Sequence, residues 1–283
     1  MVHSDWGDWL VRAVEAADPE RLAVWYLGCN GFVLKAGDGT TLFVDPYCGT
    51  GDPPRTVRMV PVPFDPADVS EVDAVFATHE HTDHVHGPTQ APLVAAGGEF
   101  YAPDDSLAVV EEERWREAYG LRDAFHEVSE GDSVTVGEVT VHVEPANDPD
   151  ATHPVAYVVE YDGATFCHAG DARPGEGFAA VGEAYDIDLG AVAFGSVGML
   201  PDKETGELTR TRWYNDENQI VEVAGQLRLE RLLPTHWDMW KGMTADPAAL
   251  IEHVRGFEHP AELVLAETGD RVDVERGGAR FRG

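Results

Sequence analysis

Short apolar runs broken by Gly, Pro and Asp recur along most of the chain, and this pattern is typical of β-strands joined by tight turns. Segments with this pattern lie at residues 22–46, 72–78, 125–146, 154–171, 188–195, 231–237 and 261–278. Within one of them, the dipeptide Asp162-Gly163 predicts a hairpin turn, because both residues tolerate the backbone that suits twisted antiparallel strands.

Amphipathic segments with helical spacing separate several of these strands. They lie at residues 4–20, 89–98, 106–120, 215–230 and 247–258. We expect Ser4 or Asp5 to cap the first helix and Pro19 to follow its end. Residues 47–69 are rich in Pro and Gly and predict a long loop that ends in a short helical turn.

This order of elements predicts an α/β (α+β) protein in which two sheets are sandwiched between helices. Hairpins are frequent and strict strand–helix–strand alternation is missing, so a single parallel sheet is disfavoured. No internal repeat or low-complexity linker divides the chain. We therefore expect one domain over residues 1–283, with residues 1–20 as an N-terminal helical extension.

The composition of the chain narrows its partners. A hydrophobic content of 43% is enough for a core. The net charge is −32, from 20 basic and 52 acidic residues, and it disfavours nucleic acid and anionic membranes as binding partners. The acids are scattered along the chain, which favours a halophilic adaptation to a salt-rich cytoplasm over one acidic interaction surface. We expect a small-molecule substrate and leave a homo-oligomer open.

The three cysteines, Cys29, Cys48 and Cys167, are far apart and form no Cys-x-x-Cys pair, which favours buried thiols in a reducing compartment. The first residues lack the basic start and apolar core of a signal peptide. Apolar runs stay well short of the roughly 20 residues that a membrane helix needs. We therefore expect a soluble, cytoplasmic protein.

The stretch FATHEHTDH, residues 76–84, concentrates metal-ligand side chains behind an apolar strand. His79 and His81 are two residues apart, so a loop can bring both imidazoles to one ion, and Asp83 and His84 offer donors to a second. A helical metalloprotease site is excluded because Asp83 stands four residues after His79. A polar loop with strand-capping histidines is the ordinary alternative, but four donors within six residues favour a metal site.

Further donors stand next to other predicted strands, where they could complete a pair of ions. Asp171 follows one strand, His236 ends another, His153 precedes a third and Asp45 ends the strand at LFVDP. Each also has an ordinary interpretation as a turn former, a strand cap or a surface residue.

The segments WYLGCNGFVL, VDPYCGTG, DAVFATHEHTDH, CHAGD and LLPTHWDMW together resemble hydrolases of the metallo-β-lactamase fold, in particular the L-ascorbate 6-phosphate lactonase branch. The resemblance extends from residue 24 to about residue 247 and implies a four-layer αββα sandwich. It implies that one divalent ion is held by His79, His81 and His153. It implies a second ion at Asp83, His84 and His236, with Asp171 bridging the two and Asp45 orienting the ligands.

From these ions we expect a metal-bound hydroxide that opens a lactone, with Asp83 orienting the nucleophile as well as binding metal. Zn²⁺ and Mn²⁺ both accept such nitrogen and oxygen ligands. A di-iron oxygen site is disfavoured because relatives of that kind have Glu at the position of His81. A phosphodiesterase of the same fold and a non-catalytic metal-dependent ligand-binding protein are the alternatives.

A sugar-derived, phosphorylated lactone such as L-ascorbate 6-phosphate would need cations or donors near the ions. The candidates are Asn30, Arg173, Arg212 and Lys241. The arginines and the lysine also fit ordinary surface ion pairs, and Asn30 also fits a plain turn.

Overall fold

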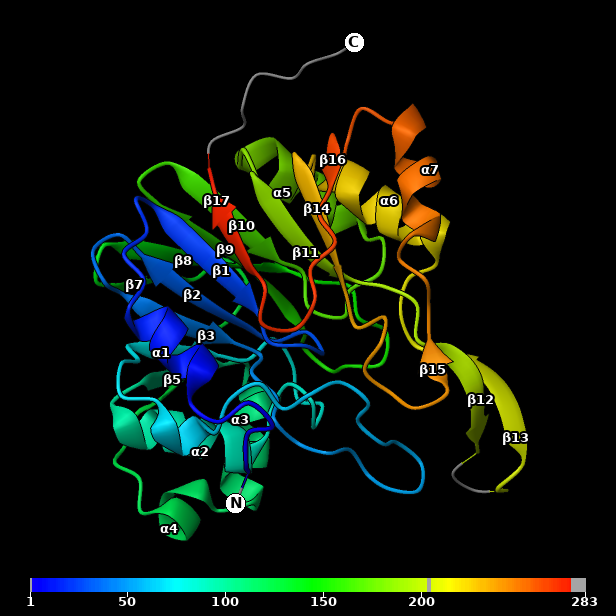
Figure 1. Cartoon of the computed structure of the whole chain (residues 1–283). Helices are drawn as coiled ribbons and strands as arrows, with labels where there is room; N and C mark the ends of the chain where they lie inside the picture. The colour runs from blue at the N-terminus through cyan, green and yellow to red at the C-terminus, as the bar shows by residue number, and fades with distance from the viewer. Residues whose placement is uncertain (1, 203–204, 276–283) are drawn as a thin grey trace.

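Two seven-stranded sheets face each other in the computed structural model, which describes residues 2–202 and 205–275 (Figure 1). In spatial order, the first sheet contains β17 (Arg271–Val274), β1 (Leu22–Tyr26), β2 (Phe32–Ala36), β3 (Thr41–Val44), β4 (Ala74–Phe76), β5 (Glu99–Ala102) and β6 (Phe125–Glu127). The second contains β16 (Glu262–Leu263), β14 (Arg231–Thr235), β11 (Leu189–Ala193), β10 (Ala164–His168), β9 (Val155–Tyr161), β8 (Val139–Pro145) and β7 (Ser133–Val136).

Helices cover the outer face of each sheet. The first sheet is covered by α1 (Trp9–Glu15), α2 (Gly87–Ala96), α3 (Asp104–Glu112) and α4 (Trp115–Tyr119), with the 3-10 turn η1 (Pro66–Asp68) beside α2. The second sheet is covered by α5 (Glu176–Ala184), α6 (Glu217–Gln226) and α7 (Ala249–His253), which continues into the 3-10 turn η2 (Val254–Gly256). These four layers confirm the predicted αββα sandwich.

Three apolar cores correspond to the three spaces between these layers. The middle core contains inward-facing residues of both sheets, such as Phe32 and Phe166, whose rings lie 5.4 Å apart. The first sheet packs its other face on α1 and α2, and the second packs on α5 and α6. Burial on both faces explains why the central strands are almost wholly apolar rather than alternating.

Parallel pairing brings several strand ends to one edge of the sandwich. Val44 of β3 pairs with Phe76 of β4, so the loops that follow these strands begin side by side. Ala193 of β11 pairs with Thr235 of β14, and β10 runs parallel to β11. Because the carboxyl ends of parallel strands meet at the same edge, loops far apart in sequence converge there.

The local predictions were partly right. The hairpin between β9 and β10 turns at Asp162 and Gly163, which have φ angles of 46° and 73°. The first helix is shorter than predicted, and neither predicted residue caps it, because Asp5 accepts a hydrogen bond from Val62 N instead. The predicted helix at residues 106–120 is broken by Arg114, which adopts a left-handed φ of 56°.

A hairpin that the pattern did not predict extends from the body near its lower edge (Figure 1). It consists of β12 (Val197–Pro201) and β13 (Leu208–Arg212), and the short β15 (Met243–Thr244) pairs with β12. Residues of β12 are mostly half-buried and those of β13 mostly exposed, so the apolar signal of a buried strand is missing. Across the described residues, none of the helices has the length and apolar character needed to cross a bilayer.

Candidate metal centre

The loop after β4 places two histidines in the interior with their Nε2 atoms facing a common point. His84 Nδ1 lies 2.7 Å from Asp45 Oδ2, and the Thr78 hydroxyl donates to the same carboxylate. The Nδ1 atom of His79 lies 3.0 Å from the Thr78 hydroxyl. Because each Nδ1 is engaged outside the centre, each Nε2 is available to bind an ion, and the predicted orienting role of Asp45 fits this geometry.

Four side chains form what we call the first donor group: His79, His81, Asp148 and Asp171. One ligand atom from each lies within 4.8 Å of the others. Within this group, His79 Nε2 lies 3.0 Å from His81 Nδ1 and 3.6 Å from Asp148 Oδ2. Two imidazoles and two carboxylates at this spacing are a donor set that divalent ions bind in proteins.

Asp171 also belongs to a second donor group, with His84 and His236. Its Oδ2 lies 3.3 Å from His84 Nε2, and its Oδ1 lies 3.3 Å from His236 Nε2. Asp83 Oδ2 lies 3.7 Å from His236 Nε2. The carboxylate of Asp171 therefore lies between the two groups and belongs to both.

The loop after β1 holds this carboxylate in place. Asn30 donates from Nδ2 to Asp171 Oδ1 at 3.0 Å and accepts from the Thr235 hydroxyl at 2.8 Å. His168 Nε2 lies 2.7 Å from the Asn30 carbonyl oxygen and fixes the same turn. Asn30 is fully buried and both ends of its amide are engaged, so it positions Asp171 and is not the substrate donor that we predicted.

His236 is fixed from several directions. Its main-chain N–H donates to the Cys29 carbonyl oxygen at 2.9 Å, and its own carbonyl oxygen accepts from the Ser196 hydroxyl at 2.6 Å. The Tyr214 ring stacks on its imidazole with the centroids 4.1 Å apart. Cys29, Asp45 and His236 all adopt left-handed φ angles, of 59°, 45° and 66°. Such strain at non-glycine residues clusters at functional sites.

Burial and neighbouring charges shift the pKa values of the residues in the centre. Burial raises the pKa of Asp171, but His236 and His84 outweigh it and hold this pKa well below its usual value. Burial lowers the pKa of His84, but the carboxylates of Asp171 and Asp45 raise it overall. Burial, and then the negative charge of Asp171, raise the pKa of Asp148. Burial, and then the neighbouring His84, lower the pKa of His79, so this imidazole favours the neutral form that binds metals.

Two buried polar atoms show that the centre fits a cation. Within the described part of the chain, neither His84 Nε2 nor Asp148 Oδ2 has a hydrogen-bond partner, although each faces other donors of its group. A buried unsatisfied polar atom costs about 1–3 kcal/mol, so native proteins rarely keep one without a role. A bound divalent ion in each group would satisfy both atoms.

The predicted role of His153 was wrong. His153 lies near the end of the loop before β9, but its side chain is 70% exposed and its Nδ1 lies 2.6 Å from Asp105 Oδ2. This pair and the neighbouring Asp104 form a separate surface group. Asp148, five residues earlier, belongs to the first donor group in its place, and its side chain is only 4% exposed.

The predicted substrate-binding cations have different surroundings. Arg173 Nη2 donates to Asp150 Oδ2 at 3.2 Å. The carbonyl oxygen of the same residue, Asp150, lies 3.1 Å from His81 Nε2. Arg212 is engaged with Asp216, the residue that caps α6. Lys241 is exposed in the loop after β14. The structure therefore places Arg173 beside the first donor group.

Sequence reasoning missed Asp148, Cys29 and Thr78. Asp148 lies three residues beyond the end of β8, and its position just past a strand end was a usable signal. Cys29 was treated as an ordinary buried thiol, yet its Sγ lies 3.5 Å from Asp83 Oδ2. Thr78 directly precedes His79, and only its contact with Asp45 reveals its role.

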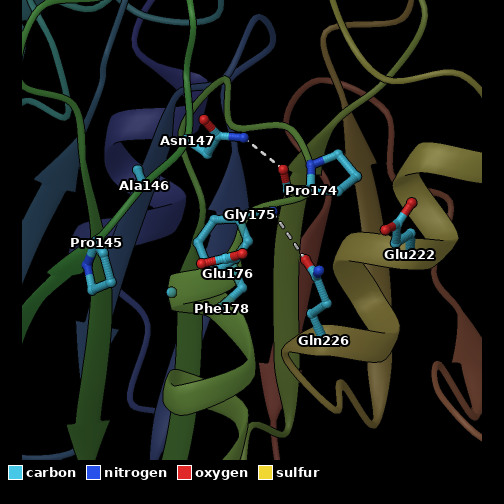
Figure 2. A pocket seen from close by; sticks show the side chains of 10 residues that line it. Pro145, Ala146, Asn147, Pro174, Gly175, Glu176, Phe178, Glu222 and Gln226 are labelled. Atoms are coloured by element: carbon cyan, nitrogen blue, oxygen red, sulfur yellow. Dashed lines mark hydrogen bonds between the residues drawn. The ribbon is translucent and has the colours of Figure 1, made fainter.

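A separate surface cleft of about 490 Å³ lies between the end of β8 and helices α5 and α6 (Figure 2). Asn147 donates to the Pro174 carbonyl oxygen across it, and Gln226 accepts from the Gly175 N–H. The residues that line it include two acids, Glu222 and Glu176, and no member of either donor group. The cleft is therefore distinct from the candidate metal centre.

Comparison with known proteins gives one matching family. The profile of the "Beta-lactamase superfamily domain" matches residues 40–237. Two curated relatives, each named "Probable L-ascorbate-6-phosphate lactonase UlaG", come from Salmonella gallinarum and Escherichia fergusonii. Each is 28% identical over 290 residues, which is 86% of this chain and 77% of the relative.

Solved structures support the fold. The metallo hydrolase Igni18 from Ignicoccus hospitalis superposes with a TM-score of 0.65 at 18% identity, covering 89% of this chain and 97% of its own. The isothiocyanate hydrolase from Delia radicum gut bacteria gives a TM-score of 0.65 at 16% identity, covering 89% and 98%. At these identities the likeness concerns the fold alone.

Proposed function

This chain belongs to the Beta-lactamase superfamily, and we propose that it is a metal-dependent hydrolase that opens a sugar-derived, phosphorylated lactone such as L-ascorbate 6-phosphate. The observation that carries the proposal is the position of Asp171 between two groups of buried donors. The names of the curated relatives support the lactone, and Arg173 beside the centre supports the phosphate.

Each ion would have its own ligands, with one carboxylate shared between them. His79, His81 and Asp148 would hold one ion, and His84 and His236 would hold the other, with Asp171 shared. When bound, such ions supply a hydroxide nucleophile near neutral pH and polarise the carbonyl that it attacks. Asp45, Thr78 and Asn30 keep the ligands oriented, as the hydrogen bonds described above require.

Asp83 is the carboxylate best placed to handle a reacting water. Its side chain is 18% exposed, against 4% for Asp148 and 6% for Asp171. A carboxylate at the solvent edge can accept a hydrogen bond from the attacking water and orient it toward the lactone carbonyl. This position supports the nucleophile-orienting role that the sequence predicted for Asp83, and its Oδ2, 3.7 Å from His236 Nε2, also lies within reach of the second ion.

Recognition of the phosphate would depend on few cations, since the chain carries 20 basic residues against 52 acidic ones. Arg173 donates to the Trp213 carbonyl oxygen at 2.8 Å, and within the described residues its Nε has no partner. Its side chain is 30% exposed, so it retains capacity to bind an anion that approaches the first donor group.

The test compares two substrates that differ only in the phosphate. Purified protein loaded with Zn²⁺ or Mn²⁺ should open L-ascorbate 6-phosphate faster than L-ascorbate, and a chelator should stop the reaction. Asp171→Ala and His81→Ala should lose at least about 10³-fold in kcat/KM while the fold, measured by circular dichroism, is kept. Turnover of a phosphodiester but of neither lactone, or activity that survives metal removal, would overturn the proposal.

A further inference from the structure

Cys29 lies at the edge of the second donor group, and its surroundings differ from those of an ordinary buried thiol. Its Sγ lies 3.5 Å from Asp83 Oδ2 and 3.6 Å from both ring nitrogens of His236. One ligand atom from each of these three residues falls within 4.8 Å of the others. We call Cys29, Asp83 and His236 the sulfur triad.

Hydrogen bonds to the main chain fix the position of the Cys29 sulfur. The residues after β1 form a tight turn in which Gly31 N–H donates to the Gly28 carbonyl oxygen at 3.0 Å. The Cys29 carbonyl oxygen accepts from His236 N–H at 2.9 Å and from the Tyr26 hydroxyl at 2.9 Å. These bonds join the β1–β2 turn to the loop after β14, so the sulfur and the His236 imidazole have a fixed relation.

The other two cysteines provide an internal comparison. Cys48 lies in the outer core under the first sheet, with its Sγ 3.7 Å from the Phe64 carbonyl oxygen. Cys167 lies in the core between the second sheet and its helices. Neither belongs to a group that could hold a metal ion among the described residues, whereas Cys29 does. The position of Cys29 is therefore not a general consequence of thiol burial.

We propose that Cys29 is a thiolate ligand of the second ion and that this sulfur selects Zn²⁺ over Mn²⁺. The inference rests on the metal-dependent function proposed above. Cys29 would complete a donor set in which His84 Nε2 and His236 Nε2 both face Asp171, and His84 Nε2 has no hydrogen-bond partner among the described residues. Thiolate sulfur binds zinc strongly, whereas manganese prefers oxygen donors, so one sulfur changes which ion the centre keeps.

The proposed step is deprotonation of the thiol and coordination of the thiolate, without any change of oxidation state. The S–H bond of Cys29 breaks, its electron pair stays on sulfur and forms the bond to the ion, and the proton leaves to solvent. Binding of Zn²⁺ therefore releases protons, as for other thiolate sites.

Cobalt substitution tests the assignment directly. The metal-free full-length chain is loaded with Co²⁺ alone, and its near-ultraviolet spectrum is recorded. We expect a sulfur-to-cobalt charge-transfer band in the wild type and in the matched controls Cys48→Ser and Cys167→Ser, and its loss in Cys29→Ser. A band that persists in Cys29→Ser would overturn the proposal.

A second measurement needs no variant and so does not depend on folding. X-ray absorption of the Zn²⁺-loaded wild type should show a sulfur shell at about 2.3 Å in addition to nitrogen and oxygen at about 2.0–2.2 Å. Cys29→Ser should weaken Zn²⁺ binding at one of two sites about 100-fold and leave Mn²⁺ affinity within about threefold. Equal losses for both ions would contradict the selectivity.

The two proposals fail in different ways. If the wild type binds two ions per chain without any sulfur signal, the assignment of Cys29 is overturned and the hydrolase proposal stands. If the wild type binds no ion at all, the hydrolase proposal fails and the Cys29 assignment fails with it.

Discussion

Replacing Asp148 with asparagine tests the position at which the structure departs most from the sequence prediction. Asp148→Asn removes an anionic donor from the first donor group but keeps the oxygen that accepts from Asp150 N–H at 3.0 Å. The matched variant is His153→Ala, which removes the residue that the sequence favoured. Only one of the two variants should change metal binding.

The expected magnitude follows from the number of donors. A four-ligand zinc site contributes about 10–16 kcal/mol of apparent binding free energy, so an equal share is about 2.5–4 kcal/mol for each ligand. Asp148 is one of four donors in its group. Its replacement should therefore weaken one of the two ions by about 10²–10³-fold, while His153→Ala leaves both affinities unchanged.

In the metal-free protein, Asp148→Asn should not lower the stability of the fold. Asp148 Oδ2 has no hydrogen-bond partner among the described residues, and burial and the charge of Asp171 both disfavour its ionised form. Removing this charge relieves a repulsion, so metal-free Asp148→Asn should be at least as stable as the wild type at neutral pH. A structural role without metal binding predicts a loss of stability instead.

Chelator competition gives the two affinities, elemental analysis gives the number of ions, and thermal unfolding of the metal-free proteins gives the stability. The reasoning is refuted if Asp148→Asn keeps two ions with wild-type affinity. It is also refuted if His153→Ala loses one.

Three further predictions concern the core, one surface carboxylate and the substrate. Phe166→Ala removes a fully buried ring that packs on Phe32 and should lower the free energy of unfolding by about 3–5 kcal/mol in urea titrations; a loss below about 1 kcal/mol would contradict the described core. Partial burial raises the pKa of Asp38, but hydrogen bonds from the neighbouring turns outweigh it and hold the pKa below its usual value. Its stabilising effect should therefore be complete above the unfolded pKa of about 3.9 and disappear as the pH falls through the folded pKa, so that wild type and Asp38→Asn converge in acid unfolding. Arg173→Ala should raise KM for L-ascorbate 6-phosphate about tenfold and leave L-ascorbate unchanged, whereas Arg212→Ala should affect neither; equal losses on both substrates would exclude a phosphate role for Arg173.

Much of the fold could be predicted because its signals are local. A buried strand must be apolar, and Asp162-Gly163 has the backbone freedom that a tight hairpin turn needs. The hairpin of β12 and β13 was missed because its strands bury little and so carry no such pattern. The break at Arg114 was missed because the left-handed conformation of a single residue leaves no periodic trace.

The sequence alone determined the part of the centre that is formed by neighbouring residues of one loop. His79, His81, Asp83 and His84 follow one strand so closely that backbone geometry keeps them together in almost any fold. Whether Asp148 or His153 completes the first donor group, and whether Cys29 reaches the second, depends on which loops meet at the shared edge of two sheets. That meeting is fixed by strand pairing and packing between segments more than 100 residues apart, as for Cys29 and His236, whose separation is 207 residues. Spacing along the chain holds no information about such a contact, so only the tertiary structure decided it.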